Sequence, residues 1–234
     1  MGSLALILVC GPALAQTPTA QPPAAKPAPG APTVLRPGLF FREVWKQNPN
    51  GAELSLTQAS VANPDLQVKI YGPDPALQGD KSVLKTTGKD GDDNNPAHIF
   101  SGECRTACAM TLRHKTAYAD LSTPLARIRI ATKMSGLHKL YPLIKLANGD
   151  WYVGDRPQGP SIRDWMVSDI AVAEIGWIKI DAATLLTKGN PVDKIDLGKV
   201  DEIGFADPMP ASGHGPGGWF DLGQIEVFAR STPR

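Results

Sequence analysis

Aromatic and cationic residues gather in the middle of the sequence, where together they could bind a ligand rich in hydroxyl groups. The chain has only four Tyr and six Phe but five Trp, three of them at Trp151, Trp165 and Trp177. Aromatic rings stack on the apolar C–H faces of sugars, and planar or charged side chains hydrogen-bond the hydroxyls. The candidate ligand-binding residues are Arg127, Arg129, Lys133, Lys145, Tyr152, Arg163 and His214.

A strand must carry the first three of these residues. Segment 127–133 reads Arg-Ile-Arg-Ile-Ala-Thr-Lys, so polar and apolar residues alternate. Because successive side chains of a strand point to opposite faces, Ile128 and Ile130 share one face and the cationic residues share the other. We expect the cationic face to be solvated or to bind a ligand.

A hairpin is predicted around Asn148-Gly149, the dipeptide that most readily adopts the positive φ values of a two-residue type I′ turn. In that register Lys145 lies opposite Tyr152, and Leu146 lies opposite Trp151. We therefore expect Tyr152 to present its ring beside Lys145 and Trp151 to face the core.

The whole chain favours strands over helices, because apolar residues recur at a spacing of two and turn residues interrupt them every ten to fifteen positions. This pattern predicts an all-β fold, an antiparallel β-sandwich of one domain. The expected strands lie at 39–45, 66–71, 127–133, 140–146, 151–155, 165–168, 177–180, 200–206 and 222–228.

The end of the sequence resembles a known fold family. Segment 197–205, a glycine-rich loop and segment 222–228 look like the last two strands of galactose-binding-like β-jelly-roll domains, and segment 125–155 is similar to their ligand-side strands. Carbohydrate-binding modules are the largest class of such domains, and the chain most resembles uncharacterised secreted bacterial proteins of this fold. The resemblance implies a jelly roll that binds an oligo- or polysaccharide without cleaving it.

The same resemblance implies a structural calcium ion between the first and last strands. Glu43 and Glu226 are the carboxylates in those segments. Calcium takes six to eight oxygen ligands, so backbone carbonyl groups would have to complete the site. No other cofactor is expected.

The glycine-rich loop at 208–219 contains His214. A nucleotide-binding loop must open a helix, whereas a strand follows here, so we do not expect a nucleotide site. Loops of this kind often carry function, which makes His214 a candidate binding residue.

The first residues predict export to the periplasm or the outside of the cell. A short apolar run ends in Ala13-Leu14-Ala15, typical of a signal peptide at 1–15 that is cleaved before Gln16. A Pro/Ala-rich linker at 16–38 follows, and the domain is expected at 39–234. Lipid anchoring at Cys10 stays as an alternative. The apolar run is too short to span a membrane.

Cysteine use agrees with export. Only Cys104 and Cys108 remain in the mature chain, and an oxidising compartment favours a disulfide between them. On a continuous strand they would lie about 13 Å apart, so the bond requires a tight loop at 105–107, joining two strands.

Charge argues against a nucleic-acid partner, because 24 Lys and Arg nearly balance 23 Asp and Glu. Three function classes stay open: a carbohydrate-binding protein, a glycoside hydrolase or polysaccharide lyase on the same fold, and a protein-interaction module. Neither a nucleophile elbow nor a zinc-protease helix motif is present. The sequence leaves the glycan and the oligomeric state undecided.

Overall fold

Two antiparallel sheets contain the regular strands of the described residues. This computed structural model describes residues 36–75, 83–102, 104, 106–135, 139–159, 161, 163–208 and 219–234. The predicted signal peptide and nearly all of the linker lie outside these ranges, as does His214. Within them, no helix has the length and apolarity needed to cross a membrane.

Sheet A is built around β15, which pairs with β8 on one side and with β5 and β1 on the other. The strands in order are β11 (Met166–Ala171), β8 (Arg127–Ser135), β15 (Trp219–Phe228), β5 (His98–Phe100), β4 (Lys85–Thr87) and β2 (Leu54–Ser55), with β1 (Leu39–Glu43) beside β15.

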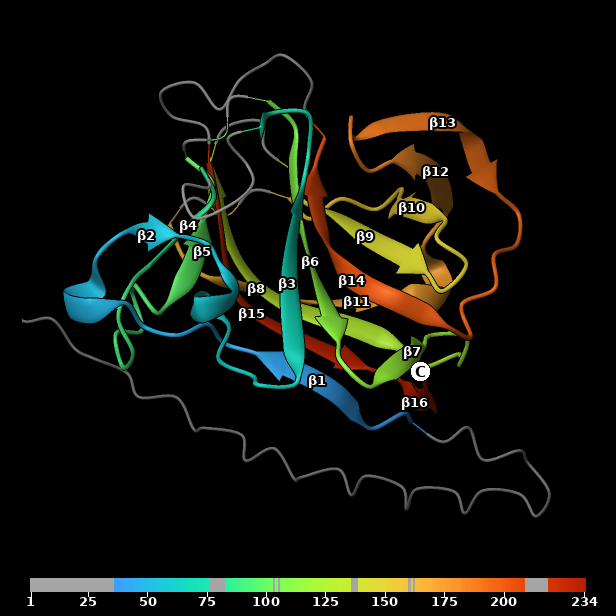
Figure 1. Cartoon of the computed structure of the whole chain (residues 1–234), viewed down its shortest axis with the longest axis horizontal. Coiled ribbons are helices and arrows are strands. Elements are labelled where there is room, and N and C mark those ends of the chain that lie inside the picture. The colour runs from blue at the N-terminus through green and yellow to red at the C-terminus, as the bar shows by residue number, and fades with distance from the viewer. Residues whose placement is uncertain are drawn as a thin grey trace, which may run out of the picture. The chain divides into compact units, whose positions relative to one another are not determined.

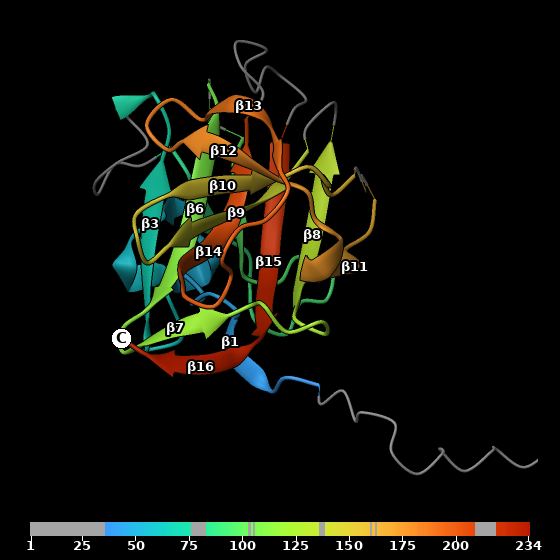
Figure 2. The same cartoon turned by 90° about the vertical axis from the view of Figure 1, so that its right-hand side faces the viewer.

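Sheet B is built around β14, which lies between β9 and β6. The strands in order are β13 (Leu186–Val192), β12 (Trp177–Asp181), β10 (Trp151–Gly154), β9 (Tyr141–Leu146), β14 (Val200–Asp207), β6 (Cys108–His114) and β3 (Leu66–Tyr71). Two further strands, β7 (Ala117–Asp120) and β16 (Arg230–Pro233), pair with each other, and β7 also pairs with β14. Figures 1 and 2 show the two layers from perpendicular directions.

The helical segments of the described residues are short 3-10 turns in the connections. They are η1 (Pro49–Gly51), η2 (Gln58–Ser60) and η4 (Val172–Glu174). The segment after β12 forms a turn that leads directly into β13.

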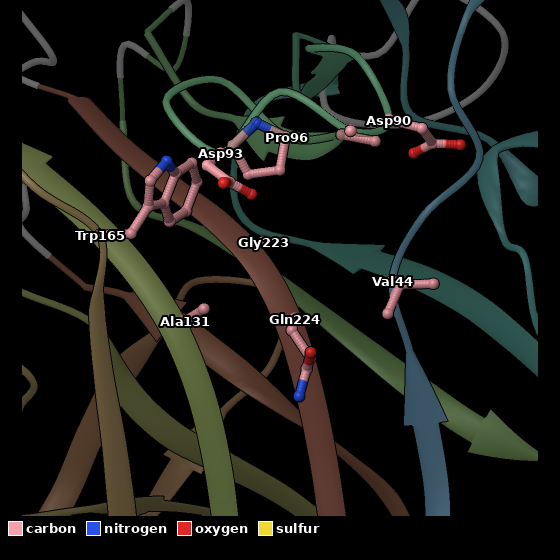
Figure 3. Close-up of a pocket in the computed structure, with 10 residues that line it drawn as sticks. Val44, Asp90, Asp93, Pro96, Ala131, Trp165, Gly223 and Gln224 are labelled. Atoms are coloured by element: carbon pink, nitrogen blue, oxygen red, sulfur yellow. The ribbon is translucent and has the colours of Figure 1, made fainter.

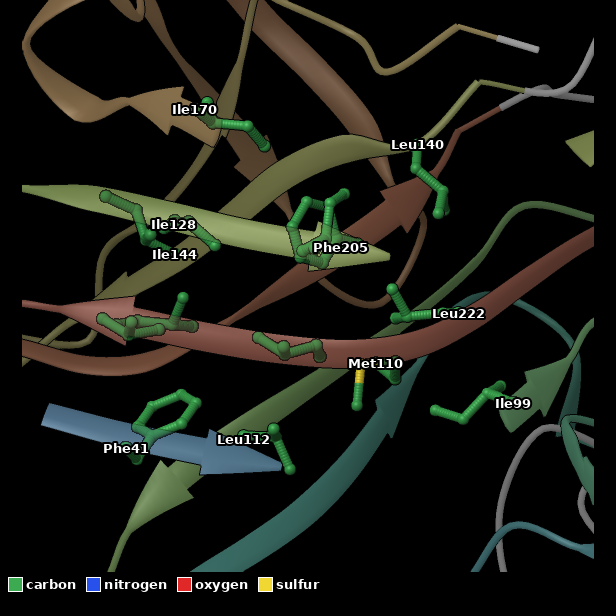
Figure 4. Close-up of a cluster of buried hydrophobic side chains, with 14 of the residues drawn as sticks. Phe41, Ile99, Met110, Leu112, Ile128, Leu140, Ile144, Ile170, Phe205 and Leu222 are labelled. Carbon is green, nitrogen blue, oxygen red and sulfur yellow. The ribbon is translucent and has the colours of Figure 1, made fainter. Parts of the chain in front are cut away.

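One hydrophobic core fills the space between the sheets. Sheet B contributes Met110, Ile144 and Phe205, and sheet A contributes Ile128 and Leu222, all with almost no exposed surface. Figure 4 shows these side chains between the two layers of strands. Strands such as β8 and β15 therefore have one face in this core. The outer face of sheet B carries a second, smaller group of buried apolar residues, which includes Leu143, Val153 and Ala206. The predicted antiparallel β-sandwich of jelly-roll type is confirmed.

Candidate functional site

The hairpin between β9 and β10 has a different register from the predicted one. Trp151 lies opposite Lys145, and Tyr152 lies opposite Ile144. The loop has three residues rather than two: the Leu146 amide donates to the Asp150 carbonyl, and Gly149 adopts a φ of 92°. This matches a turn closed by a glycine bulge.

A shift of one residue exchanges the two faces of a strand. The ring of Trp151 therefore lies on the outer face of sheet B beside Lys145, and Tyr152 is buried in the core with an exposed fraction of 8%. The prediction that the Tyr152 ring lies beside Lys145 on the outer face is wrong.

A β-bulge at Asp201 decides where Glu202 points. Val200 pairs with Leu146 and Glu202 pairs with Lys145, so Asp201 is an extra residue on β14. Val200 and Ile203 both belong to the core although they are three positions apart, which a regular strand would not allow. The bulge thus brings Glu202 to the outer face of sheet B.

Glu202 is the centre of a polar cluster on that face. Lys69 Nζ and Lys145 Nζ lie 2.9 Å and 3.3 Å from its Oε1 atom. The hydroxyl groups of Tyr71 and Thr111 each donate a hydrogen bond of 2.7 Å to its Oε2 atom. The four donors come from β3, β6 and β9, so the cluster exists only because β14 lies among these strands.

These partners keep the carboxylate ionised. Burial alone would raise the pKa of Glu202, but hydrogen bonds from Thr111, Lys69 and Tyr71 outweigh burial and hold the pKa below its ordinary value. Burial and the neighbouring Glu202 carboxylate raise the pKa of the Tyr71 hydroxyl, which therefore stays protonated. The Tyr71 hydroxyl is fixed as a donor to Glu202.

Two aromatic rings adjoin the cluster. Tyr71 and Trp151 meet edge to face with their ring centroids 4.6 Å apart, and Lys145 Nζ lies 5.3 Å from the Trp151 ring centroid. Both rings are partly buried and pack against a small apolar cluster that includes Leu143 and Val153. We call the group Lys69, Tyr71, Thr111, Lys145, Trp151 and Glu202 the outer site of sheet B.

The predicted cationic face of β8 lies on the other sheet. Asp169 receives a two-pronged contact from Arg129, at 3.0 Å and 2.8 Å, and a contact of 3.4 Å from Arg127. Glu226 lies 3.6 Å from Arg129, and the Arg127 guanidinium lies 3.8 Å from the Phe228 ring centroid. The alternation of buried and outward residues along 127–133 is as predicted, but the guanidinium groups are already engaged by carboxylates.

The structure does not bring the predicted ligand-binding residues into one site. Lys133 is on the outer face of sheet A near Asp221, its pairing partner on β15. Arg163 is exposed in the connection before β11. His214 is outside the described residues. Of the predicted set, only Lys145 belongs to the outer site of sheet B.

Glu43 and Glu226 do not converge on one cation. Arg42 pairs with Glu226 and Glu43 pairs with Ile225, which is in the core, so the two carboxylates point to opposite faces of sheet A. Glu43 is fully buried and accepts hydrogen bonds from the backbone amides of Trp45, Ala62 and Asn63 at 2.7–3.0 Å. Among the described residues, no group of three or more His, Cys, Asp or Glu side chains is arranged to hold a metal.

Cys104 and Cys108 are not joined by a disulfide bond, and both are buried. The predicted disulfide is therefore absent, although the two side chains are hydrogen-bonded to each other. The segment between them is also not a hairpin, because β5 belongs to sheet A and β6 to sheet B. Burial, followed by the contact with Cys104, raises the pKa of the Cys108 thiol.

Sequence reasoning missed Tyr71, Lys69, Trp151 and Glu202 as site residues. One signal was available, because Lys69 and Tyr71 alternate with Val68 and Ile70 in a strand that was predicted with its correct bounds. Nothing in the sequence marks the bulge that turns Glu202 outward.

The arrangement is suited to binding a polar ligand with an apolar face. Each lysine ammonium has three donors, and the contact with Glu202 uses only part of this capacity. The side chains of Lys69 and Lys145 have exposed fractions of 39% and 25%, so both can reach a ligand. The partly exposed Trp151 ring offers an apolar surface next to them.

Comparison with known proteins finds similarity in structure only. No protein-family model and no curated protein matches the sequence. Among similar solved structures is a family 11 carbohydrate-binding module of a cellulosomal cellulase from Clostridium thermocellum, with a TM-score of 0.42, 12% identity and coverage of 76% of this chain and 95% of the module.

Two other solved structures are similar at a comparable level. A family 11 module from Clostridium thermocellum in complex with a β-1,3-1,4-mixed-linked tetrasaccharide has a TM-score of 0.43, 12% identity and the same coverage of 76% and 95%. An exo-β-agarase has a TM-score of 0.38 and 9% identity, with coverage of 74% of this chain and 23% of the enzyme. The assignment of the fold rests on the strand pairing described above.

Proposed function

We propose that this chain is a secreted or periplasmic protein that binds an oligo- or polysaccharide at the outer site of sheet B and does not cleave it. The observation that carries the proposal is the contact between the Tyr71 and Trp151 rings beside the buried Glu202 carboxylate and its two lysines. Export is proposed from the leader sequence alone.

The rings supply the apolar half of such a site. A pyranose ring has a C–H face that packs on an aromatic side chain, and Tyr and Trp lose little conformational entropy when they are held in place. Trp151 is held by its contact with Tyr71, whose hydroxyl is in turn fixed by Glu202. This support keeps the indole ready for a ligand without further ordering.

The lysines supply the polar half. Sugar hydroxyls accept hydrogen bonds from ammonium groups, and charge-assisted hydrogen bonds are stronger than neutral ones. The ammonium groups of Lys69 and Lys145 both donate hydrogen bonds to Glu202, which fixes their positions.

The state of Glu202 favours binding over catalysis. A glycosidase needs a carboxylic acid whose pKa is raised, so that it can protonate the leaving group, and a second carboxylate that reaches the substrate. Glu202 has a lowered pKa, is fully buried and uses both oxygens in contacts within the protein. It therefore serves to position other groups.

The test is retention of the purified chain on a panel of immobilised plant and bacterial polysaccharides, followed by titration with the best soluble oligosaccharide. Trp151→Ala is expected to weaken binding at least about tenfold, which corresponds to about 1.4 kcal/mol. Arg129→Ala is the matched control, because it removes an outward side chain from the other sheet and should leave affinity unchanged.

Three outcomes would contradict the proposal. Unchanged affinity in Trp151→Ala would remove this site, and a loss in Arg129→Ala would move binding to sheet A. Release of reducing ends or unsaturated uronates from the polysaccharide would instead show an enzyme. Circular dichroism of each variant checks that the fold is intact.

A further inference from the structure

A cavity lies on the outer face of sheet A, whereas the outer site described above lies on sheet B. Its volume is about 280 Å³, and it is lined by residues of β8, β15, the connection after β1 and the loop before β5. Figure 3 shows Trp165 on one side and Val44 on the other, with Asp93 and Asp90 along one edge and Gln224 at the opposite edge. The cavity is of a size that admits a single monosaccharide unit.

Trp165 forms a fixed wall of this cavity. Its Nε1 atom donates a hydrogen bond of 3.3 Å to the Asn94 carbonyl, and its ring meets the buried His98 ring with centroids 5.3 Å apart. A Cβ atom on Gly223 would lie 3.1 Å from the indole, so the glycine lets the ring settle against the sheet. An indole held from three sides is preorganised for a ligand.

Two carboxylates, those of Asp90 and Asp93, line one edge of the cavity. The carboxylates of Asp90 and Asp93 have no hydrogen-bond or ion-pair partner among the described residues. The neighbouring Asp92 differs, because its carboxylate accepts the backbone amides of Asn94 and Asn95. Both aspartates are exposed. Ionised carboxylates only accept hydrogen bonds, so a ligand that displaces their water must supply donors, and a positively charged donor best matches two negative charges.

The opposite edge requires a second polar group on the occupant. Gln224 Oε1 accepts a hydrogen bond of 2.9 Å from Arg42, which leaves the amide N–H groups of Gln224 to donate. A lysine side chain has one ammonium group on an apolar stem and would meet only the Asp edge. An amino sugar has an ammonium group, hydroxyl groups on other edges and an apolar face for Trp165, and ammonium groups are also attracted by indole rings.

We propose that this cavity is a second binding site, which takes a saccharide unit bearing a free ammonium group, such as glucosamine. The ammonium group binds Asp90 and Asp93, the sugar ring packs on Trp165, and Gln224 donates to a hydroxyl. The site is independent of the outer site of sheet B, so failure of either leaves the other testable.

The experiment titrates the full chain with a glucosamine trisaccharide, measures affinity by calorimetry and follows the indole N–H signal of Trp165 by heteronuclear NMR. We expect saturable binding that weakens with salt, and at least about a tenfold loss of affinity in Trp165→Ala and in the double variant Asp90→Asn, Asp93→Asn. The Asn substitutions keep side-chain shape, so they test charge without removing packing. Gly223→Ala, which pushes on the indole, should also weaken binding.

Controls separate the ligand classes. Asp65→Asn removes an exposed carboxylate from the start of sheet B and should change nothing, and Trp151→Ala should retain glucosamine binding. The N-acetylated trisaccharide should bind at least about tenfold more weakly. Equal binding of the acetylated sugar, equal binding of an Nα-acetylated lysine amide, or unchanged affinity in the Asn double variant would each overturn the proposal.

Discussion

The hydroxyl group of Tyr71 donates a hydrogen bond of 2.7 Å to Glu202, which is 131 positions away in the sequence. The bond joins β3 to β14 across β6, which lies between them. It also fixes the phenol ring that supports Trp151. This hydrogen bond therefore connects the buried Glu202 carboxylate to the two aromatic rings of the site, Tyr71 and Trp151.

Tyr71→Phe keeps the ring and removes this hydrogen bond. We expect the free energy of unfolding to fall by about 1.5 kcal/mol, since the lost bond is to a charged acceptor. Urea denaturation measures the change. The substitution should weaken saccharide binding less than Trp151→Ala does, because the apolar surface remains; a larger loss would mean that the hydroxyl itself contacts the ligand.

Stability should depend on pH through Glu202. Its pKa in the folded protein is lower than its ordinary value of 4.5, so its contribution is fully present above about pH 4.5 and is lost as the pH falls through the folded pKa. The free energy of unfolding should therefore decrease on acidification below pH 4.5.

Glu202→Gln provides the comparison for this prediction. The variant should be less stable by about 1–3 kcal/mol near neutral pH, because Lys69 and Lys145 lose their counter-charge, and its stability should fall less steeply in acid. Asp120 and Asp201 also have lowered pKa values, but they titrate in both proteins and cancel in the difference. Parallel curves for the two proteins would contradict the assignment.

The two thiols should be protected in the folded protein. Cys104 and Cys108 are buried, and the raised pKa of Cys108 lowers the fraction of reactive thiolate. Without reductant, an alkylating reagent should add to neither cysteine in buffer and to both in denaturant, as intact mass shows. If denaturation alone gave no adduct and reductant restored two, the protein would contain the disulfide that the leader sequence suggests.

Export can be measured directly. Expression of the full sequence in a secreting bacterial host should give a mature protein that begins at Gln16, with its mass reduced by that of residues 1–15. Retention of the full leader in the cell, or a lipid-modified product beginning at Cys10, would contradict cleavage after Ala15.

Most of the strands could be predicted from the sequence, because a strand with one buried face has an apolar residue at every second position. The segment 66–71 coincides with β3, and 200–206 coincides with β14 to within one residue. Short edge strands such as β2 and β16 were not predicted, since they bury too few side chains to produce a pattern.

The site was harder to predict because it depends on two irregularities of one residue each. Asn148-Gly149 is compatible with a two-residue turn and with a longer turn closed by a glycine bulge, and the choice decides whether Trp151 or Tyr152 faces outward. The bulge at Asp201 has no marker in the sequence. The alternation of apolar and polar residues assigns side chains to the two faces of a strand only up to the next bulge or irregular turn.

The extra residue in β14 also determines which changes of length this strand can accept. Loss of Asp201 alone would remove the bulge and leave Glu202 outward and Ile203 in the core, because Val200 and Glu202 already pair with consecutive residues of β9. Gain of one residue between Ile203 and Phe205 would instead turn Phe205 from the core toward water, because a shift of one residue exchanges the two faces of a strand. We expect natural variants of this chain to tolerate the loss of Asp201 and to keep the length of 202–207 constant even where the residues differ.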